Sequence, residues 1–360
     1  MNVPGFELLL HGIDTLQCAY YLTQQRAGEF DFAQLLLTRE RLRAEGSREE
    51  AALTLGGVPF LLAAHGTRSG YPFLLACEDF KIECGEFNKP SFFVTFRSQA
   101  LWRESAPFLH EKFLRWAGSV GFVPYKPEHL SRVDFAFDYH LPVVDFDEDS
   151  FVTRMHKDSQ HREHGHVQTF TFGQGDIVLR IYDKVAEIEQ QSAKVWCFTL
   201  WGQDQDVWRI EWQVRKAVLR QFGISTFADL GKLQGDLLRE LCAEQATLRV
   251  RGMDTNRSRW ALHPLWADLQ ARVAELAHLG VCRLDGKTAA LEERLFRSAL
   301  SVYGYAKGYA ATHCVQRHKD ALSFEEAFRF LGKRVEGLHD PLSWGIEVEK
   351  KRRAIESGEW

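Results

Sequence analysis

Three short segments of the chain alternate polar and apolar residues with a period of two, and this pattern limits the fold more than any other feature. The segments are Arg132–Asp138, Arg180–Lys184 and Trp208–Gln213. Because successive side chains of a strand point to opposite faces of a sheet, the period predicts β-strands. If the three strands are neighbours, one face of their sheet is apolar and the other carries acids, arginines and one tyrosine.

The polar residues of these segments are unusual for a sheet face that merely meets water. Such a face favours Thr, Lys, Ser and Glu, and Asp in particular is depleted from strands. Here the polar positions hold three carboxylates and four arginines: Asp134, Asp138, Glu211, Arg132, Arg180, Arg209 and Arg215. A plain solvated face of an antiparallel sheet remains the alternative interpretation.

The carboxylates are hard oxygen ligands of the kind that suit Mg²⁺ or Mn²⁺, which polarise phosphate oxygens. Asp134 and Asp138 are roughly 13 Å apart along an ideal strand, at about 3.3 Å per residue. We therefore expect one ion to bind Asp134 together with Glu211. Asp138 is expected either to act as a second ligand through water or to orient a basic residue.

Tyr182 is the candidate nucleophile. Its hydroxyl is a weak nucleophile at neutral pH because an unperturbed tyrosine has a pKa of about 10. A cation beside the ring lowers that pKa, and Arg180 on the same strand face is placed for this task. Lys184 and Arg209 are expected to stabilise charge on a phosphate. Attack on DNA would leave a phosphotyrosyl ester, which permits later rejoining of the strand.

The same motifs, in their order and approximate spacing, resemble those of the trans-acting replication initiation factor family. The opening segment Leu10–Leu16 resembles the first strand of that family, and Asp254–Trp260 followed by Pro264–Trp266 resembles its closing block. The resemblance runs from about residue 8 to residue 270, and the final ninety residues match nothing that we can name. The family contains rolling-circle initiators of plasmids and filamentous phages and relaxases of some integrative elements.

The resemblance implies a site-specific nickase whose Tyr182 becomes joined to the 5′ end of the cut strand, with Mg²⁺ or Mn²⁺ as cofactor. The implied partner is origin DNA, which is double-stranded until it is nicked. A host helicase is expected by analogy, since the sequence has no nucleotide-binding loop of the GxxxxGK type. Whether a phage, a plasmid or an integrative element is served stays open, as does a homodimer.

Other functions fit parts of the same pattern. One alternative is a replication or regulatory protein on the same scaffold that binds DNA without cleaving it. Its acids and arginines would then form ion pairs. Metal-dependent hydrolysis by water would keep the carboxylates and make Tyr182 dispensable. The segment His164–His166 superficially resembles the two-histidine metal motif of another class of rolling-circle nickases, but Gly165 stands where those proteins have a bulky apolar residue.

Charge limits how the chain can bind DNA. A formal net charge of −4 argues against long, sequence-independent coating of DNA, for which a basic domain is expected. A binding stripe needs only a local excess of basic residues, and arginine suits phosphates because its planar fork donates two hydrogen bonds. The candidates for DNA binding are Arg132, Arg215, Lys216, Arg257 and Arg259.

Composition points to a globular protein of the cytoplasm, or of the host cytoplasm if a phage encodes it. Hydrophobic residues make up 45% of the 360 residues and aromatic residues 12%. No stretch approaches the ~20 apolar residues that span a bilayer, and no signal peptide is recognised, so no membrane contact is expected. Seven cysteines without CxxC spacing fit reduced thiols.

The expected fold class is α+β: a largely antiparallel, curved sheet with flanking helices, followed by a helical C-terminal region. We predict a catalytic domain over residues 1–265 and the helical region over 266–360. Short apolar runs over 51–98 predict a meander of strands. Helices are predicted over 30–43, with Asp31 as cap, and over 107–116, 147–157, 264–279, 288–312 and 323–336.

Two features of the C-terminal region remain. Tyr303, Tyr305 and Tyr309 are alternative nucleophiles or stacking residues, although aromatic residues at such spacing more often pack between helices. The basic run Lys350–Arg353 is a further candidate for phosphate contact.

Overall fold

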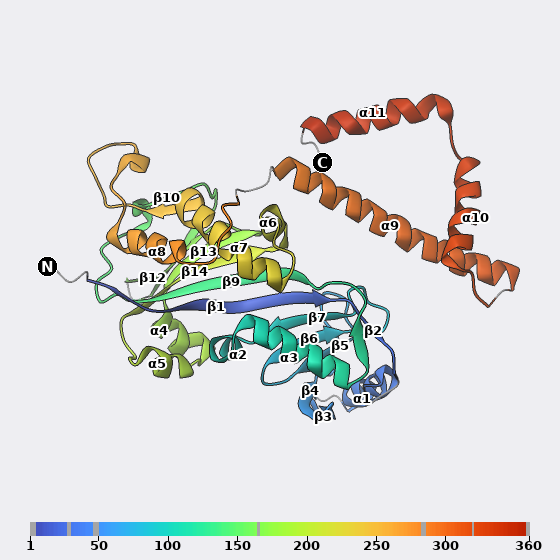
Figure 1. Cartoon of the computed structure of the whole chain (residues 1–360), viewed down its shortest axis with the longest axis horizontal. Helices are drawn as coiled ribbons and strands as arrows, with labels where there is room; N and C mark the ends of the chain where they lie inside the picture. Colours follow the sequence, from blue (N-terminus) through green and yellow to red (C-terminus); the bar gives the residue numbers. More distant parts are fainter. Residues whose placement is uncertain are drawn as a thin grey trace. The chain divides into compact units, whose positions relative to one another are not determined.

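The chain forms two compact units, Met1–Asp285 and Gly286–Trp360. The structure is a computed structural model, and it describes residues 5–26, 30–45, 50–163, 166–281, 286–318 and 320–357. Figure 1 shows the strands of the first unit with helices on both sides of them, and the second unit as three helices.

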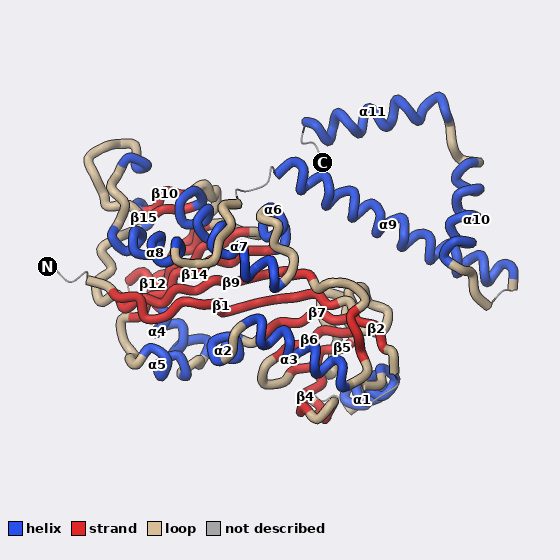
Figure 2. The backbone as a smooth tube through the Cα atoms, viewed as in Figure 1, coloured by secondary structure: helices blue, strands red, loops and turns tan. Residues whose placement is uncertain are grey.

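The first unit is built on one large antiparallel sheet, drawn in red in Figure 2. Within the described residues this sheet has eleven strands, in the order β11-β12-β13-β14-β9-β1-β7-β6-β5-β4-β3. Their bounds are β1 Glu7–Tyr20, β3 Ala51–Leu55, β4 Val58–Leu62, β5 Phe73–Ala76, β6 Phe80–Cys84, β7 Phe92–Phe96, β9 His129–His140, β11 Asp158–Glu163, β12 His166–Phe172, β13 Ile177–Asp183 and β14 Val207–Arg215. The predicted α+β class is confirmed.

Smaller elements complete the first unit. Two short strand pairs join β2 (Leu22–Gln24) to β8 (Phe122–Pro124) and β10 (Phe151–Thr153) to β15 (Ala246–Leu248). The helices are α1 Phe32–Ala44, α2 Ser98–Arg103, α3 Ala106–Ser119, α4 Lys184–Glu187, α5 Trp196–Trp201, α6 Lys216–Gln221, α7 Phe227–Glu240 and α8 Pro264–Ala274, with single turns η1 Glu148–Ser150, η2 Ile188–Ser192, η3 Leu241–Gln245 and η4 Arg257–Arg259.

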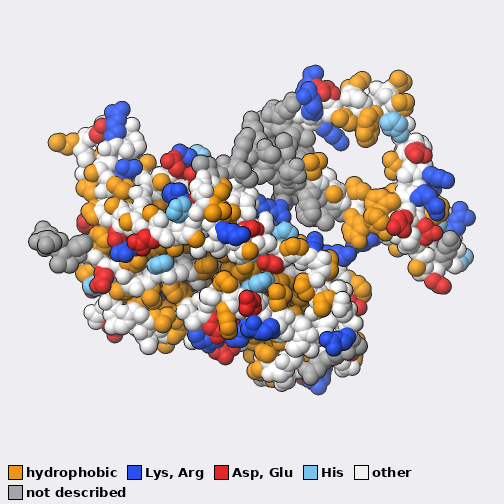
Figure 3. Space-filling view, viewed as in Figure 1, with side chains coloured by type: hydrophobic (Ala, Val, Ile, Leu, Met, Phe, Trp, Pro, Cys, Tyr) orange, Lys and Arg blue, Asp and Glu red, His pale blue; other side chains and the backbone are white. Residues whose placement is uncertain are grey.

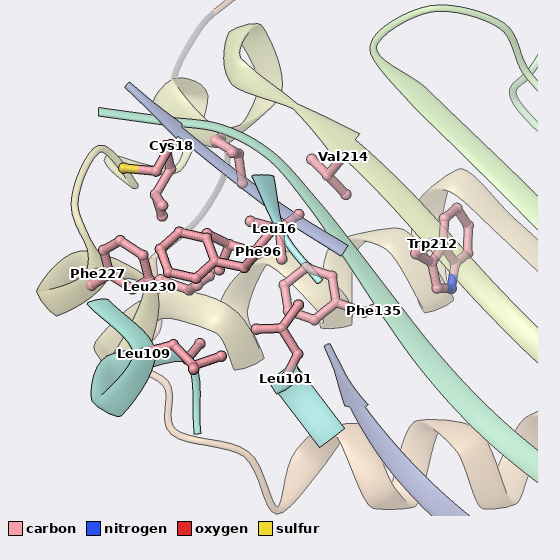
Figure 4. Close-up of a cluster of buried hydrophobic side chains, with 14 of the residues drawn as sticks. Leu16, Cys18, Phe96, Leu101, Leu109, Phe135, Trp212, Val214, Phe227 and Leu230 are labelled. Carbon is pink, nitrogen blue, oxygen red and sulfur yellow. The ribbon is translucent and has the colours of Figure 1, made fainter. Parts of the chain in front are cut away.

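The three alternating segments of the sequence are neighbouring strands, as predicted. β14 lies between β13 and β9, and β9 pairs on its other edge with the long strand β1. The apolar side chains of these strands enter the main core, where Figure 4 shows Phe135, Trp212 and Val214 among the buried residues. The polar residues of the same strands consequently share the opposite face.

Most of the predicted local elements form. The predicted helix over 30–43 is α1, and Asp31 caps it by accepting a hydrogen bond from the Ala33 amide. The meander over 51–98 is β3 to β7. The helix predicted over 147–157 is wrong: Asp147 caps only the single turn η1, after which Phe151 begins β10. Phe151 and its neighbours pair with β15, so a distant strand overrides the local pattern.

The helical region begins later than the predicted boundary at residue 265. Trp266, Leu269 and Val273 of α8 are buried in the same core as the sheet, and the Trp266 indole donates a hydrogen bond to the Cys242 carbonyl. Helix α8 therefore belongs to the first unit, and the second unit starts at Gly286.

The second unit comprises α9 (Gly286–Arg317), α10 (Phe324–Glu336) and α11 (Pro341–Ser357). Tyr303 and Tyr309 contact α10 through the Phe324 ring and the Phe330 carbonyl, whereas Tyr305 is exposed. In the basic run, Arg352 and Arg353 pair with Glu349. Hydrophobic side chains are visible on these helices in Figure 3, yet none of the described helices is long and apolar enough to cross a bilayer.

We predict that Trp266→Ala lowers the free energy of unfolding of the first unit by about 3–5 kcal/mol, because it leaves a cavity in the shared core. Leu279→Ala is the control, since Leu279 is largely exposed and its loss should cost less than about 0.5 kcal/mol. Urea denaturation of both variants measures the difference. Equal stabilities would contradict the assignment of α8 to the core of the first unit.

Candidate active site

The polar face of β13, β14 and β9 is set by the register of the strands. Tyr182 stands opposite Arg209 and Arg180 opposite Glu211, while Arg209 stands opposite Asp138 on the other edge of β14. Facing residues of an antiparallel pair have their side chains on the same side of the sheet. The register therefore brings the acids, the arginines and the tyrosine into one group.

Arg209 is the buried centre of this group, with no exposed surface. Its Nε and Nη2 donate to the two carboxylate oxygens of Asp138 at 2.6 and 2.8 Å, and its Nη1 donates to Asp14 Oδ1 at 2.7 Å. The Trp201 indole donates a further hydrogen bond to Asp138 Oδ2 at 2.9 Å. Both oxygens of Asp138 are thus engaged, and Asp138 orients a basic residue, Arg209. This is one of the two roles that the sequence predicted for Asp138.

Asp14 is a site residue that the sequence analysis did not identify. It lies at a bulge of β1 between Ile13 and Thr15, and a bulge redirects a side chain. Its carboxylate also accepts hydrogen bonds from Ser98 and the Trp102 indole and pairs with Lys194. An isolated acid in the largely apolar segment Leu8–Leu16 indicates a buried polar contact, but the sequence does not show which distant groups Asp14 contacts.

Small residues make room for one of these partners. Gly12 of β1 stands opposite Ala136 of β9, and a Cβ added at Gly12 would lie 3.2 Å from the Trp102 ring. The Trp102 indole therefore reaches Asp14 because the neighbouring strand position has no side chain. Burial alone would raise the pKa of the Asp14 carboxyl, but Arg209, Lys194 and Lys184 together hold it well below its usual range.

Tyr182 lies at the wall of a pocket of about 390 Å³ and is itself only 8% exposed. Its hydroxyl donates a hydrogen bond to Glu211 Oε2 at 2.9 Å, and Arg180 pairs with Glu211 Oε1 at 3.1 Å. Burial and the Glu211 carboxylate raise the pKa of Tyr182 well above its ordinary value, against an opposing effect of Arg209. The pKa of Tyr182 is therefore raised and not lowered as expected, and Arg180 is directed to Glu211.

The pocket is lined by cations from several elements. Arg132 and Arg180 come from strands, and Lys194 precedes α5. Lys184 was expected on a strand, but it is the first residue of α4. The Lys184 ammonium lies 5.5 Å from the centre of the Tyr182 ring and pairs with Glu187. Burial and the nearby Arg209 lower the pKa of Lys184. The pocket is therefore suited to a group with several negative oxygens.

Each of the predicted metal ligands, Asp134, Asp138 and Glu211, pairs with an arginine of the same sheet face. Asp134 and Glu211 line the pocket, but both oxygens of Asp134 accept hydrogen bonds from Arg132, and both oxygens of Asp138 accept from Arg209. Among the residues that the structure describes, no group of three or more His, Cys, Asp or Glu side chains is placed to hold a metal ion. His164 and Gly165 of the histidine-rich segment lie outside the described residues.

The predicted DNA-binding residues divide into two groups. Arg132 and Arg215 face one another on β9 and β14, and Lys216 follows at the start of α6. Arg257 and Arg259 lie on η4, where Arg257 donates to the Asp149 carbonyl at 2.9 Å and Arg259 pairs with Asp254. Arg257 lines a different pocket, beside β10. Of these five residues, only Arg132 lines the Tyr182 pocket.

Comparisons with known proteins add one similarity. No protein-family model matches the chain, and no curated protein matches it. A solved structure of a rolling circle replication initiator protein from Geobacillus stearothermophilus matches with 18% identity and a TM-score of 0.43. The match covers 76% of this chain and 99% of that protein's chain.

We predict that Arg209→Met lowers the free energy of unfolding by about 3–5 kcal/mol, because it leaves Asp138 buried without its cation and Asp14 with Lys194 alone. Arg115→Met is the matched control, since Arg115 forms an exposed pair with Glu111 that should contribute less than about 1 kcal/mol. Chemical denaturation at neutral pH compares the two. A cost for Arg209→Met no greater than that of the control would contradict the central role of Arg209.

The loss in unfolding free energy caused by Arg209→Met should be smaller at acidic pH. In the native protein the pKa of Asp14 is lowered, so its contribution to stability is present above the unfolded-state pKa of about 3.9 and is lost as the pH falls through the folded-state value. In Arg209→Met the effect of burial on the pKa of Asp14 is opposed only by the two lysines, so this carboxyl takes up its proton at a higher pH and loses less stability in acid. The difference in unfolding free energy should therefore shrink as the pH is lowered below about 5, and a constant difference would contradict this account.

Proposed function

We propose that this protein cuts one strand of DNA and holds the cut end on Tyr182, as an initiator of rolling-circle replication does. One observation carries the proposal: a buried tyrosine hydroxyl at a pocket wall donates to a carboxylate, while four cations line the same pocket. A phosphodiester brings the negative oxygens that such cations bind. The paired carboxylate supplies an acceptor for the phenol proton.

In the proposed reaction Glu211 takes the proton of Tyr182 as the phenolic oxygen attacks the phosphorus. The bond between tyrosine and phosphorus forms while the bond between phosphorus and the 3′ oxygen breaks. We assign the proton that the 3′ oxygen needs to the Lys184 ammonium, whose lowered pKa makes it a better acid than an ordinary lysine. Arg180 and Arg132 bind the phosphate oxygens. The products are a 5′-phosphotyrosyl end and a free 3′ hydroxyl.

The need for Mg²⁺ or Mn²⁺ stays a prediction. Asp134 and Glu211 both line the pocket with hard oxygen donors, and the charge of Glu211 contributes to the raised pKa of Asp134, after the larger effect of burial. Their partners are arginines, so we assign no step of the reaction to a metal ion. Origin DNA, a helicase and a second copy of the chain are likewise proposed partners.

A non-cleaving DNA-binding protein is the second candidate, and one observation favours it. Asp134, Asp138 and Glu211 each pair with an arginine of the same sheet face, which is the arrangement that a structural role for these charges predicts. Under this alternative the pocket binds DNA phosphates, and Tyr182 contributes only a hydrogen bond.

We predict that the purified protein nicks supercoiled DNA carrying its cognate origin and forms a covalent protein–DNA product, and that Tyr182→Phe forms neither. Denaturing gels after incubation with Mg²⁺ or Mn²⁺ measure both products, and a parallel reaction with chelator tests the cation. Tyr139→Phe is the matched control, because Tyr139 lies on the other face of β9 and its hydroxyl donates to Asp268. Cleavage that persists in Tyr182→Phe would exclude Tyr182 as nucleophile, and no cleavage by the native protein would favour the binding protein.

We further predict that Glu211→Gln slows nicking by about 10²–10⁴-fold, the usual contribution of a general base. The amide keeps the size of the side chain and can still accept a hydrogen bond from Tyr182, but it cannot take the proton. Gln213→Asn is the control, because it lies on the same strand face and changes no charge. A nicking rate for Glu211→Gln equal to that of Gln213→Asn would contradict the assigned role.

A further inference from the structure

Another pocket of the first unit, of about 390 Å³, combines aromatic and basic side chains. It is formed where β1 and β8 end and β2 begins, and its lining includes Tyr21, Tyr125 and Lys126. The Tyr125 ring is 51% exposed. Nothing in the chemistry proposed for Tyr182 uses these residues.

The aromatic side chains of this pocket are held in place by one another. The Tyr21 ring contacts the rings of Tyr125 and His129 edge to face, with centres 6.2 and 5.7 Å apart. The Lys126 ammonium lies 3.5 Å from the centre of the Tyr21 ring, which is a close cation–π contact. The face of Tyr21 is therefore covered by a cation, and Tyr125 is the ring that offers surface to a ligand.

Basic residues surround the aromatic group. Burial first, and then the charges of Arg220, Lys216 and Lys126, lower the pKa of His129, so these cations lie within electrostatic reach of its ring. Lys89 acts on Lys126 in the same way. The acid of the pocket, Glu128, accepts a hydrogen bond from the Phe227 amide and lies 3.9 Å from His110, so it is engaged on the side of α3 and α7.

Cations also connect this pocket to the one at Tyr182. His129 and Asp134 lie on the same strand, roughly 17 Å apart at about 3.3 Å per residue. Arg132 lines the Tyr182 pocket, Arg215 stands opposite it, and Lys216 continues from Arg215 into α6, which contacts β9. The basic residues thus continue along the end of the sheet from one pocket to the other.

We propose that the pocket of Tyr21, Tyr125 and Lys126 binds single-stranded DNA, with a base stacked on the Tyr125 ring and phosphates on the surrounding cations. A ring beside a basic groove is the combination that binds single strands without sequence preference, because every base has a face that stacks. A duplex keeps its bases stacked on one another and cannot offer one to Tyr125. The proposal deepens the proposed function, since nicking creates a single strand next to the Tyr182 pocket.

The test is a binding measurement in a protein that cannot form the proposed covalent product. In a Tyr182→Phe background, the Kd for a fluorescent oligothymidylate is measured by anisotropy, with a duplex of the same length in parallel. Adding Tyr125→Ala should raise the Kd for the single strand about fivefold to a hundredfold, the effect of losing one stacked base. The Kd for the duplex should change much less.

Three further variants sharpen the result. Tyr125→Phe keeps the ring and should bind the single strand as the Tyr182→Phe parent does. Tyr305→Ala removes a tyrosine of α9 that is more exposed than Tyr125 and should leave the Kd unchanged. Lys126→Ala should reduce the slope of log Kd against log salt by about 0.7, the value for one phosphate contact of a single strand.

Two outcomes would overturn the proposal: a Tyr125→Ala variant that binds the single strand as tightly as its parent, or one that loses affinity equally for the single strand and the duplex. Because Tyr125 is half exposed, its truncation should leave the thermal unfolding midpoint unchanged, which circular dichroism checks. Strand binding and nicking are measured separately. A protein that binds as proposed but never nicks would contradict only the proposed function.

Discussion

The pairing of Arg209 with Asp138 and Asp14 is the interaction on which the rest of the site depends. A guanidinium with no exposed surface must have its charge matched and its donors satisfied, since an unpaired buried charge costs several kcal/mol. The two carboxylates that match it come from β9 and from the bulge of β1. One side chain therefore holds three strands in register, and a slip of one residue would separate all of its partners.

That register decides which residues meet at the pocket. With Arg209 opposite both Asp138 and Tyr182, Glu211 falls opposite Arg180, two residues further along the strand from Arg209. A tyrosine is long enough to reach such a diagonal neighbour. The hydrogen bond between Tyr182 and Glu211 is thus a consequence of the buried ion pairs, although neither residue of that bond belongs to them.

The sequence predicts the strands well because their period of two is a local property, and it also predicts which residues share the polar face. It cannot predict the pairing across strands. Residues 184–206, which contain α4, η2 and α5, separate β13 from β14, and β9 reaches β14 only after some seventy residues, so no short turn fixes the register. For this reason Arg209 was expected at a phosphate, whereas it is buried between two carboxylates. Asp14, Trp102 and Trp201 were missed for the same reason: each meets the site through a contact distant in the chain.

The hydrogen bond of Tyr182 also bears on when the proposed reaction can begin. With its pKa raised by burial and by Glu211, the phenol holds its proton, and a free protein is not a ready nucleophile. Arg180 reaches Glu211 through one terminal nitrogen and Gln213 through the other, so both arms of its guanidinium are engaged on the polar face. Under the proposed function, a phosphate that enters the pocket shares the donors of Arg180 with these two residues, and the phenol gives its proton to Glu211 only as its oxygen bonds to phosphorus.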